Sequence, residues 1–301
     1  MGDDTHTTEA WTVARLLAWT SEYLAQAQVD EPRLSTELLL AHALGWAKID
    51  LYARFDHVPA ETQRTAFREL IRQAAEHQPI AYLIGRKEFY SLSFEVTPDV
   101  LIPRPETETL VERVIDHCRA GAAPEVNFLD LGTGSGCIAV AVLSQVPTAR
   151  AVASDVSPAA LAVARGNADR HGVSDRLACV EADALALPSE CVPEGGFDLI
   201  ASNPPYIADE DLPALPDSVR RFEPRIALTA GPDGLAFYRV LQGSAAEILK
   251  PGGSLFVEIG AGAAGEVRRI LESENRFRHT GTWRDHIEGH ERTLQFVRGE
   301  A

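Results

Sequence analysis

Lysine is scarce in this sequence. Only Lys48, Lys87 and Lys250 occur among its 28 basic residues, which face 44 acidic ones. The net charge of −16 argues against a general affinity for nucleic-acid phosphate, because such binding requires a basic surface. No apolar run approaches the ~20 residues that a membrane span needs. Residues 1–4 include two aspartates and no apolar run follows them, so no secretory signal is expected.

Cysteine is also sparse, and its spacing is not that of a metal site. Cys118, Cys137, Cys179 and Cys191 form no Cys-x-x-Cys pair and no pattern of cysteine and histidine ligands. We interpret them as reduced thiols, and therefore expect a cytoplasmic protein without a bound metal. At 301 residues the chain is long enough for two domains.

The pattern of apolar residues divides the chain into a helical part and an alternating part. Residues 1–85 predict a small helical bundle, which could stabilise the protein or dock a partner protein. Residues 86–105 predict a hairpin, a short strand at 100–102 and a proline-stiffened linker, after which Thr107 could cap the next helix. Residues 106–301 predict a doubly wound, mostly parallel sheet. Its expected strands are 126–131, 151–154, 177–180, 197–201, 254–259, 277–283 and 293–297, the last a candidate antiparallel edge.

The tetrapeptide Asn203-Pro204-Pro205-Tyr206 directly follows a predicted buried strand, where open α/β sheets bind ligands. Its prolines stiffen the backbone and leave their carbonyl oxygens free to accept hydrogen bonds. A planar NH2 group fits this loop, since its hydrogens reach the Asn203 side-chain oxygen and the Pro204 carbonyl while Tyr206 packs against its plane. Taken alone, the tetrapeptide is equally compatible with a tight turn that ends a strand.

A glycine-rich loop, Asp130-Leu131-Gly132-Thr133-Gly134-Ser135-Gly136, follows the first strand of the sheet. Its G-x-G-x-G spacing differs from the G-x-G-x-x-G of dinucleotide sites. Asp155 ends the second strand, where a carboxylate can accept from ribose hydroxyls, and Asp183 after the third can accept from an adenine amine. These features predict an S-adenosylmethionine site. The predicted cofactor-binding residues are Asp130, Gly132, Thr133, Gly134, Ser135, Gly136, Asp155, Asp183, Ala184 and Asn203.

Two further motifs accompany these, Ile-Pro-Arg-Pro-Glu-Thr-Glu at 102–108 and Phe-Glu-Pro-Arg at 222–225. Together and in this order, after a helical domain, the motifs resemble the HemK/PrmC family of peptide chain release factor N5-glutamine methyltransferases over nearly the whole chain. The resemblance implies a class I S-adenosylmethionine-dependent methyltransferase fold, Rossmann-like, with a seven-stranded mostly parallel sheet and a small N-terminal helical bundle. It also implies a substrate glutamine in the Gly-Gly-Gln loop of a release factor. Asn203, Pro204, Pro205 and Tyr206 would bind this glutamine, with Asn203, Pro204 and Tyr206 catalytic.

The chain departs from the family pattern at two places. Ala184 stands where some members carry an aromatic residue beside the adenine, and Ala230 replaces the first glycine of a Gly-Gly-x-Asp-Gly-Leu stretch. Three alternatives stay open: a ribosomal-protein glutamine methyltransferase, a nucleic-acid N6-adenine methyltransferase, and a cofactor-binding protein without turnover. We expect a monomer with no direct nucleic-acid or membrane contact, in which residues 1–85 dock the substrate protein.

Overall fold

The computed structural model describes residues 10–121 and 125–299. Residues 1–4, where no secretory signal is expected, lie outside this part. The chain forms two compact units, one comprising residues up to Gly85 together with Asp217–Phe222, and the other comprising Arg86–Pro216 and the residues from Glu223 onward. None of the described helices combines the length and the apolar character needed to cross a membrane.

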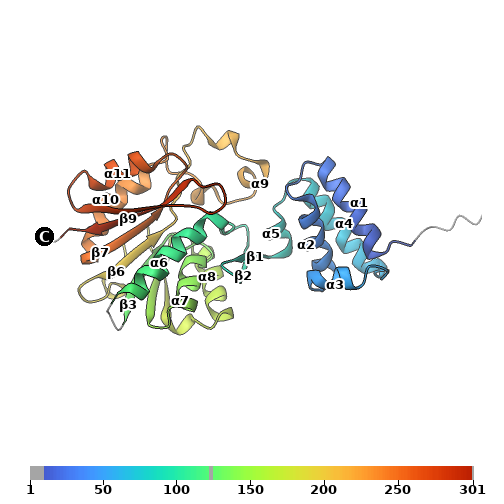
Figure 1. Cartoon of the computed structure of the whole chain (residues 1–301), viewed down its shortest axis with the longest axis horizontal. Coiled ribbons are helices and arrows are strands. Elements are labelled where there is room, and N and C mark those ends of the chain that lie inside the picture. Colours follow the sequence, from blue (N-terminus) through green and yellow to red (C-terminus); the bar gives the residue numbers. More distant parts are fainter. Residues whose placement is uncertain (1–9, 122–124, 300–301) are drawn as a thin grey trace, which may run out of the picture. The chain divides into compact units, whose positions relative to one another are not determined.

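The first unit is helical. It contains α1 (Val13–Gln26), α2 (Pro32–Leu44), α3 (Lys48–Ala53), α4 (Glu61–Ala75), α5 (Ile80–Ile84) and the short α9 (Asp217–Arg220) (Figure 1). Thr12 begins α1 by accepting a hydrogen bond from the Arg15 amide at 3.3 Å. Fully buried leucines from α1, α2 and α3 pack with Phe67 of α4 into one core, which confirms the predicted helical bundle.

The second unit is built on a seven-stranded sheet with the order β5-β4-β3-β6-β7-β9-β8. Its strands are β3 (Val126–Leu131), β4 (Ala149–Asp155), β5 (Leu177–Glu181), β6 (Phe197–Ser202), β7 (Leu249–Glu258), β8 (Phe277–Arg284) and β9 (Glu291–Arg298). The first five strands in this order are parallel, whereas β9 runs antiparallel to both β7 and β8. The mostly parallel sheet is therefore confirmed. The prediction that the last strand forms an edge is wrong, because β9 lies inside and buries Leu294 and Phe296, and β8 takes the edge.

Helices cover both faces of this sheet (Figure 1). One face carries α6 (Glu108–Ala120), α7 (Cys137–Gln145) and α8 (Pro158–Arg170), and the other carries α10 (Ala236–Ile248) and α11 (Ala264–Glu272). Successive residues of β3 alternate between the two cores, so Phe128 packs on the first side and Leu129 on the second. The sheet is thus buried on both sides, as expected for parallel strands.

The segment before α6 contains the hairpin of β1 (Arg86–Phe89) and β2 (Leu92–Glu95), followed by a 3-10 turn at Pro105–Thr107. The prediction of a strand at 100–102 is wrong, because the Ile102 amide donates to the Glu223 carboxylate at 3.2 Å instead of to a neighbouring strand. Thr107 does occupy the position before α6, but its hydroxyl makes no capping hydrogen bond. This hydroxyl instead accepts a hydrogen bond from the Asn203 side chain.

Candidate active site

The predicted site residues follow β3, β4, β5 and β6, which are neighbouring parallel strands. Their carboxyl ends meet at one edge of the sheet, beside the point where the strand order reverses. A cavity of about 540 Å³ opens there. It is lined by seven of the residues predicted from the sequence, namely Gly132, Gly134, Asp155, Asp183, Ala184, Asn203 and Pro205.

Residues from the long connection after β6 line the same cavity. Pro224, Ile226 and Ala227 come from the Phe-Glu-Pro-Arg region, and Phe237 comes from α10. Val100 and Leu101, which lie ahead of the Pro-Arg-Pro-Glu segment, also line it. The motifs that are far apart in the sequence therefore border one cavity.

Glycine is required at three positions of the loop after β3, but not for the same structural reason at each. Gly132 and Gly134 have φ angles of +71° and +53°, and a Cβ at either would meet no atom within 4 Å. Because both line the cavity, a side chain there would project toward the ligand space. Gly136 differs, since a Cβ there would lie 3.1 Å from the Cβ of Ala164. Its small size permits the close packing of α7 on α8.

The buried Asp130 side chain fixes the glycine loop by hydrogen bonds. It is fully buried, and its Oδ2 accepts hydrogen bonds from the Thr133 hydroxyl at 2.6 Å and the Ala139 amide at 3.1 Å. Burial raises the pKa of Asp130 to about 6, although the bond from Thr133 opposes this rise. Asp130, Thr133 and Ser135 are buried and are absent from the cavity lining. These three predicted residues therefore support the loop from inside the protein and do not face the cavity.

Asp155 is fixed between the glycine loop and the start of α8. Its Oδ2 accepts from the Gly134 amide and its Oδ1 from the Ser157 amide, both at 2.9 Å. Each carboxylate oxygen can accept a second hydrogen bond, so Asp155 can still bind hydroxyl groups in the cavity. Asp183 is exposed and also lines the cavity, and Ala184 beside it has a left-handed φ of +47°.

Asn203 lies at the end of β6 with its side chain oriented by a hydrogen bond. Its Nδ2 donates to the Thr107 hydroxyl oxygen at 3.0 Å. Its side-chain oxygen is therefore the polar atom left for a ligand in the cavity that Asn203 lines. Sequence reasoning did not find this role of Thr107, although the Pro-Glu-Thr motif that carries it was noted.

The aromatic end of the tetrapeptide is packed against two glycines. A Cβ on Gly234 would overlap the carbonyl oxygen of Tyr206, and a Cβ on Gly260 would lie 3.3 Å from the Tyr206 ring. Burial raises the pKa of Tyr206 to about 12, so its hydroxyl stays protonated. Tyr206 and Pro204 are not among the residues that line the cavity in the described chain. Gly234 belongs to the family-like stretch at 230–235, and its close approach to Tyr206 explains why this position requires glycine.

An ion pair between a half-buried arginine and a buried glutamate joins the two further motifs. The Arg104 guanidinium donates to Glu223 Oε1 at 2.7 Å, and Glu223 Oε2 accepts from the Ile102 amide. The Glu223 side chain is only 1% exposed. Because Val100, Leu101 and Pro224 all line the cavity, this pair fixes two parts of its wall to each other.

Glu258 is a second feature that the sequence did not reveal. It ends β7 next to β6, and it is only 1% exposed. Burial raises the pKa of Glu258 to about 7, although the nearby Thr107 and Arg292 side chains oppose this rise. Its Oε2 has no hydrogen-bond partner among the described residues. A continuous apolar run, Leu255-Phe256-Val257, that ends in a single acid was the available sequence signal.

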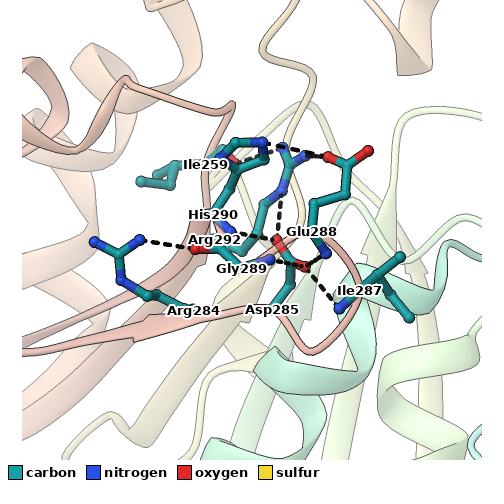
Figure 2. A network of polar contacts seen from close by, with 8 residues as sticks. All are labelled: Ile259, Arg284, Asp285, Ile287, Glu288, Gly289, His290 and Arg292. Carbon is teal, nitrogen blue, oxygen red and sulfur yellow. Dashed lines mark hydrogen bonds and ion pairs between the residues drawn. The ribbon is translucent and has the colours of Figure 1, made fainter.

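The loop between β8 and β9 wraps around Asp285 beside the end of β7 (Figure 2). Asp285 Oδ1 accepts from the amides of three consecutive residues, 287–289, at 2.6–3.1 Å, and Oδ2 accepts from the His290 amide at 3.2 Å. Burial alone would raise the pKa of Asp285, but these backbone donors outweigh it and lower the pKa. Arg292 pairs with Asp285 at 3.4 Å and reaches the Ile259 carbonyl. The loop therefore neutralises Arg292 close to Glu258.

Known proteins resemble both units of the chain. Residues 15–85 match the family described as the PrmC N-terminal domain, and residues 123–297 match a methyltransferase domain. A release factor glutamine methyltransferase from Rhodopirellula baltica is 42% identical over 286 residues, covering 94% of this chain and 95% of that protein. A protein of the same name from Geobacter sulfurreducens is 45% identical over 256 residues, covering 85% and 87%.

Among solved structures, the hMettl16 catalytic domain in complex with MAT2A 3′UTR hairpin 1 is similar with a TM-score of 0.55. It is 17% identical, and the alignment covers 70% of this chain and 75% of that one. At this identity the likeness concerns the fold alone.

Proposed function

The chain belongs to the release factor glutamine methyltransferase family, and from this premise we propose that it methylates the side-chain amide nitrogen (N5) of a glutamine in a peptide chain release factor. The glutamine is the one in the Gly-Gly-Gln motif, and the methyl donor is S-adenosylmethionine. The observation that carries the proposal is the oriented Asn203 amide, whose Nδ2 is held by Thr107 so that its oxygen can accept from a substrate NH2 group.

The cavity fits the cofactor. Gly132 and Gly134 leave open space where any side chain would intrude, and Asp155 keeps accepting capacity for ribose hydroxyls beside them. Asp183 lines the cavity where it can accept from the adenine amine. S-adenosylmethionine, when bound, supplies a methyl group activated by a sulfonium centre. Ala184 offers only a methyl side chain beside the adenine, so ring stacking would contribute nothing at that position.

The residues of the chain then act on the substrate amide by positioning. An amide nitrogen is a weak nucleophile, because its lone pair is delocalised into the carbonyl. The Asn203 oxygen and the Pro204 carbonyl accept the two NH2 hydrogens, orient the nitrogen, and stabilise the positive charge that develops on it. Tyr206, with its hydroxyl protonated, packs against the amide plane. No general base is required before transfer, and the proton leaves the nitrogen afterwards to water or a backbone oxygen.

A methyl-transfer assay with a radiolabelled donor tests this function directly. Release factor, ribosomal protein and DNA are offered side by side, and the labelled protein is digested and mapped by mass spectrometry. We expect label on the glutamine of Gly-Gly-Gln in release factor only. Label on ribosomal protein or on DNA, without label on release factor, would refute the assignment. Methylation of ribosomal protein and methylation of DNA, the two alternative activities, are thus each tested by one arm of the assay.

We also propose that residues 1–85 dock the release factor, while residues 106–301 carry the methyl-transfer site. A single glutamine side chain offers too little surface to select one protein among many. A truncated chain starting at Arg86 should bind cofactor and methylate a short Gly-Gly-Gln peptide as the full chain does, but should act poorly on intact release factor. Undiminished transfer to intact release factor by the truncated chain would reject the docking role.

A further inference from the structure

We propose that a pocket between α1 and α4 of the helical unit binds the substrate release factor, by taking up a large apolar side chain that has a carboxylate beside it. The inference rests on the proposed function and assigns a surface to the docking role of residues 1–85. The two helices lie side by side (Figure 1), and a cavity of about 360 Å³ opens between them. Its lining residues come from α1, from α4 and from the residues just before α1, all within one unit.

The interior of the pocket is apolar, and its size suits a side chain. Leu16 of α1 and Phe67 and Ile71 of α4 line it, and each is at most 8% exposed. Pockets for small molecules span roughly 300–1,000 Å³, so this cavity lies near the small end of that range. One large apolar side chain with part of its own backbone is therefore a better fit than a ligand of nucleotide size.

The outer wall of the pocket is aromatic. Trp11 and Trp19 both line it and meet edge to face, with ring centroids 6.1 Å apart. Tyr23, one turn further along α1, stacks on Trp19 at 5.3 Å and continues the aromatic surface beyond the pocket. Trp19 and Tyr23 are 50% and 39% exposed. Tryptophan and tyrosine contribute most to binding in protein interfaces, and a partner that covers these rings removes their apolar surface from water.

Thr20 places a polar group among these apolar residues. It is fully buried, it lines the pocket, and its Oγ1 has no hydrogen-bond partner among the described residues. A threonine inside a helix can donate to the carbonyl oxygen four residues earlier, as Thr36 of α2 does to Pro32 at 2.7 Å. Thr20 makes no such bond. Because buried hydroxyl groups are nearly always paired, Thr20 is placed to bond to a polar group that enters the pocket.

The rim of the pocket is positively charged, although the protein as a whole carries −16. Arg64 and Arg68 of α4 line the pocket and both pair with Glu61, Arg68 at 2.5 Å. Two guanidinium groups thus share one carboxylate, which leaves a net charge of 2 − 1 = +1. The Arg15 guanidinium adds another positive charge where it lies over the Trp11 ring, 4.4 Å from the centroid. A carboxylate on the partner is attracted to this rim and orients the apolar side chain next to it.

Together these features favour one occupant over two others. The aromatic surface of Trp19 and Tyr23 extends outside the pocket, where a small apolar acid would leave it uncovered. A second copy of this chain carries the same charge of −16 and would be repelled. An exposed segment of release factor, with an apolar side chain for the cavity and an acidic neighbour for the arginines, satisfies all of these contacts.

The first test measures the Kd of intact release factor for the full chain by calorimetry, without cofactor, so that no transfer takes place. Trp19→Ala should raise Kd about 30-fold, as for a residue at the centre of an interface. Phe55→Ala is the matched control, because it removes a 40% exposed aromatic side chain of the same unit that does not line the pocket. Its Kd should stay unchanged. Equal Kd values for Trp19→Ala and the unmodified protein would overturn the proposal.

Thr20→Val separates binding from folding. Valine has nearly the same shape but no hydroxyl, so the melting temperature should stay the same or rise when an unpaired buried group is removed. If the hydroxyl bonds to release factor, the same variant should raise Kd about fivefold. An unchanged Kd would show that no polar group of release factor reaches the pocket, and would contradict the proposal.

A charge reversal tests the rim. Arg68→Glu should raise Kd about tenfold and weaken its dependence on salt. Arg72→Glu changes the net charge equally on the same helix, but Arg72 pairs with Glu69 and Glu76 and does not line the pocket in the described residues. Its Kd should change little. An equal loss of affinity in both variants would show that net charge alone attracts release factor, against the assigned rim.

Methyl-transfer kinetics distinguish a failure of this inference from a failure of the proposed function. Trp19→Ala should raise KM for intact release factor, with unchanged kcat and unchanged transfer to a short Gly-Gly-Gln peptide. An unchanged KM in a protein that methylates release factor would overturn the pocket and leave the function. Binding of release factor that depends on Trp19, without any methylation, would overturn the function and leave the pocket. Self-association in sedimentation that Trp19→Ala abolishes would assign the pocket to a second copy instead.

Discussion

The two halves of the site are built by different means. In the half proposed to bind the cofactor, after β3 and β4, the carboxylates of Asp130 and Asp155 accept from backbone amides at 2.9–3.1 Å, within one loop and the helix starts beside it. In the half proposed to bind the substrate, after β6, the Asn203 amide is held by the Thr107 hydroxyl, 96 residues away along the chain, and the cavity wall is joined by Arg104 and Glu223, which are 119 residues apart. The first half is therefore local and set by backbone, and the second depends on long-range side-chain contacts.

This comparison predicts that the largest effect on transfer comes from the substrate half. Asn203→Ala removes the acceptor that orients the amide and should lower the single-turnover rate by about 10²–10³, as for loss of one oriented polar group in other enzymes. Asn203→Asp keeps an acceptor but cannot donate to Thr107 when ionised, so it should recover only part of the rate. Rapid-quench measurements on release factor check both variants, and full activity of Asn203→Ala would reduce the tetrapeptide to a structural turn.

The next largest effect is expected in the cofactor half. Asp155→Ala removes the charge-assisted acceptor for the ribose hydroxyls and should weaken cofactor binding by about 1.5–3 kcal/mol, or roughly 10- to 150-fold in Kd. The same change also frees the Gly134 amide, so the glycine loop loses a restraint. Titration calorimetry with S-adenosylmethionine checks this prediction. An unchanged Kd would remove Asp155 from the site.

The last prediction concerns the stability of the fold and its dependence on pH, and it should leave transfer and cofactor binding at neutral pH least affected. Burial raises the pKa of Asp130 to about 6 and of Glu258 to about 7, both above their usual values. Between about pH 4 and pH 7 the folded protein keeps protons that the unfolded chain loses. The free energy of unfolding should therefore fall as pH rises through this range, by on the order of 3 kcal/mol for each of the two carboxyl groups. Urea unfolding at several pH values checks this. Glu258→Gln should flatten the upper part of the slope, and an unchanged slope would contradict the raised pKa.

Local patterns predicted the glycine loop, the strand ends that carry Asp155 and Asp183, and the position of Asn203, all of which border one cavity. The glycine loop and β3 follow from apolar runs, turn residues and a strand end, all of which are read within a few residues. The spacing could not distinguish Gly136, which serves packing of α7 on Ala164, from Gly132 and Gly134, which face the cavity. Asp130 was likewise expected to lie close to the ligand, whereas its side chain is fully buried and does not line the cavity.

The long-range features were missed for a common physical reason. Residues 100–102 are apolar enough for a strand, but the Ile102 amide bonds to Glu223, a partner 121 residues away. β9 was expected at the edge, but it lies between β7 and β8, where Leu294 and Phe296 are fully buried. The residues that bury these two side chains come from other parts of the chain. Thr107 is a good helix cap by type, yet its hydroxyl accepts a hydrogen bond from the Asn203 side chain instead. None of these partners is visible in a local window.

The central claim is that the two halves control different steps, the glycine loop with Asp155 controlling cofactor affinity and Asn203 controlling transfer. The most direct test measures cofactor Kd and the single-turnover rate at saturating cofactor on the same preparations of Asp155→Ala and Asn203→Ala. The account predicts that Asp155→Ala raises Kd with a nearly unchanged rate, and that Asn203→Ala lowers the rate with a nearly unchanged Kd. A parallel change of both quantities in both variants would contradict it.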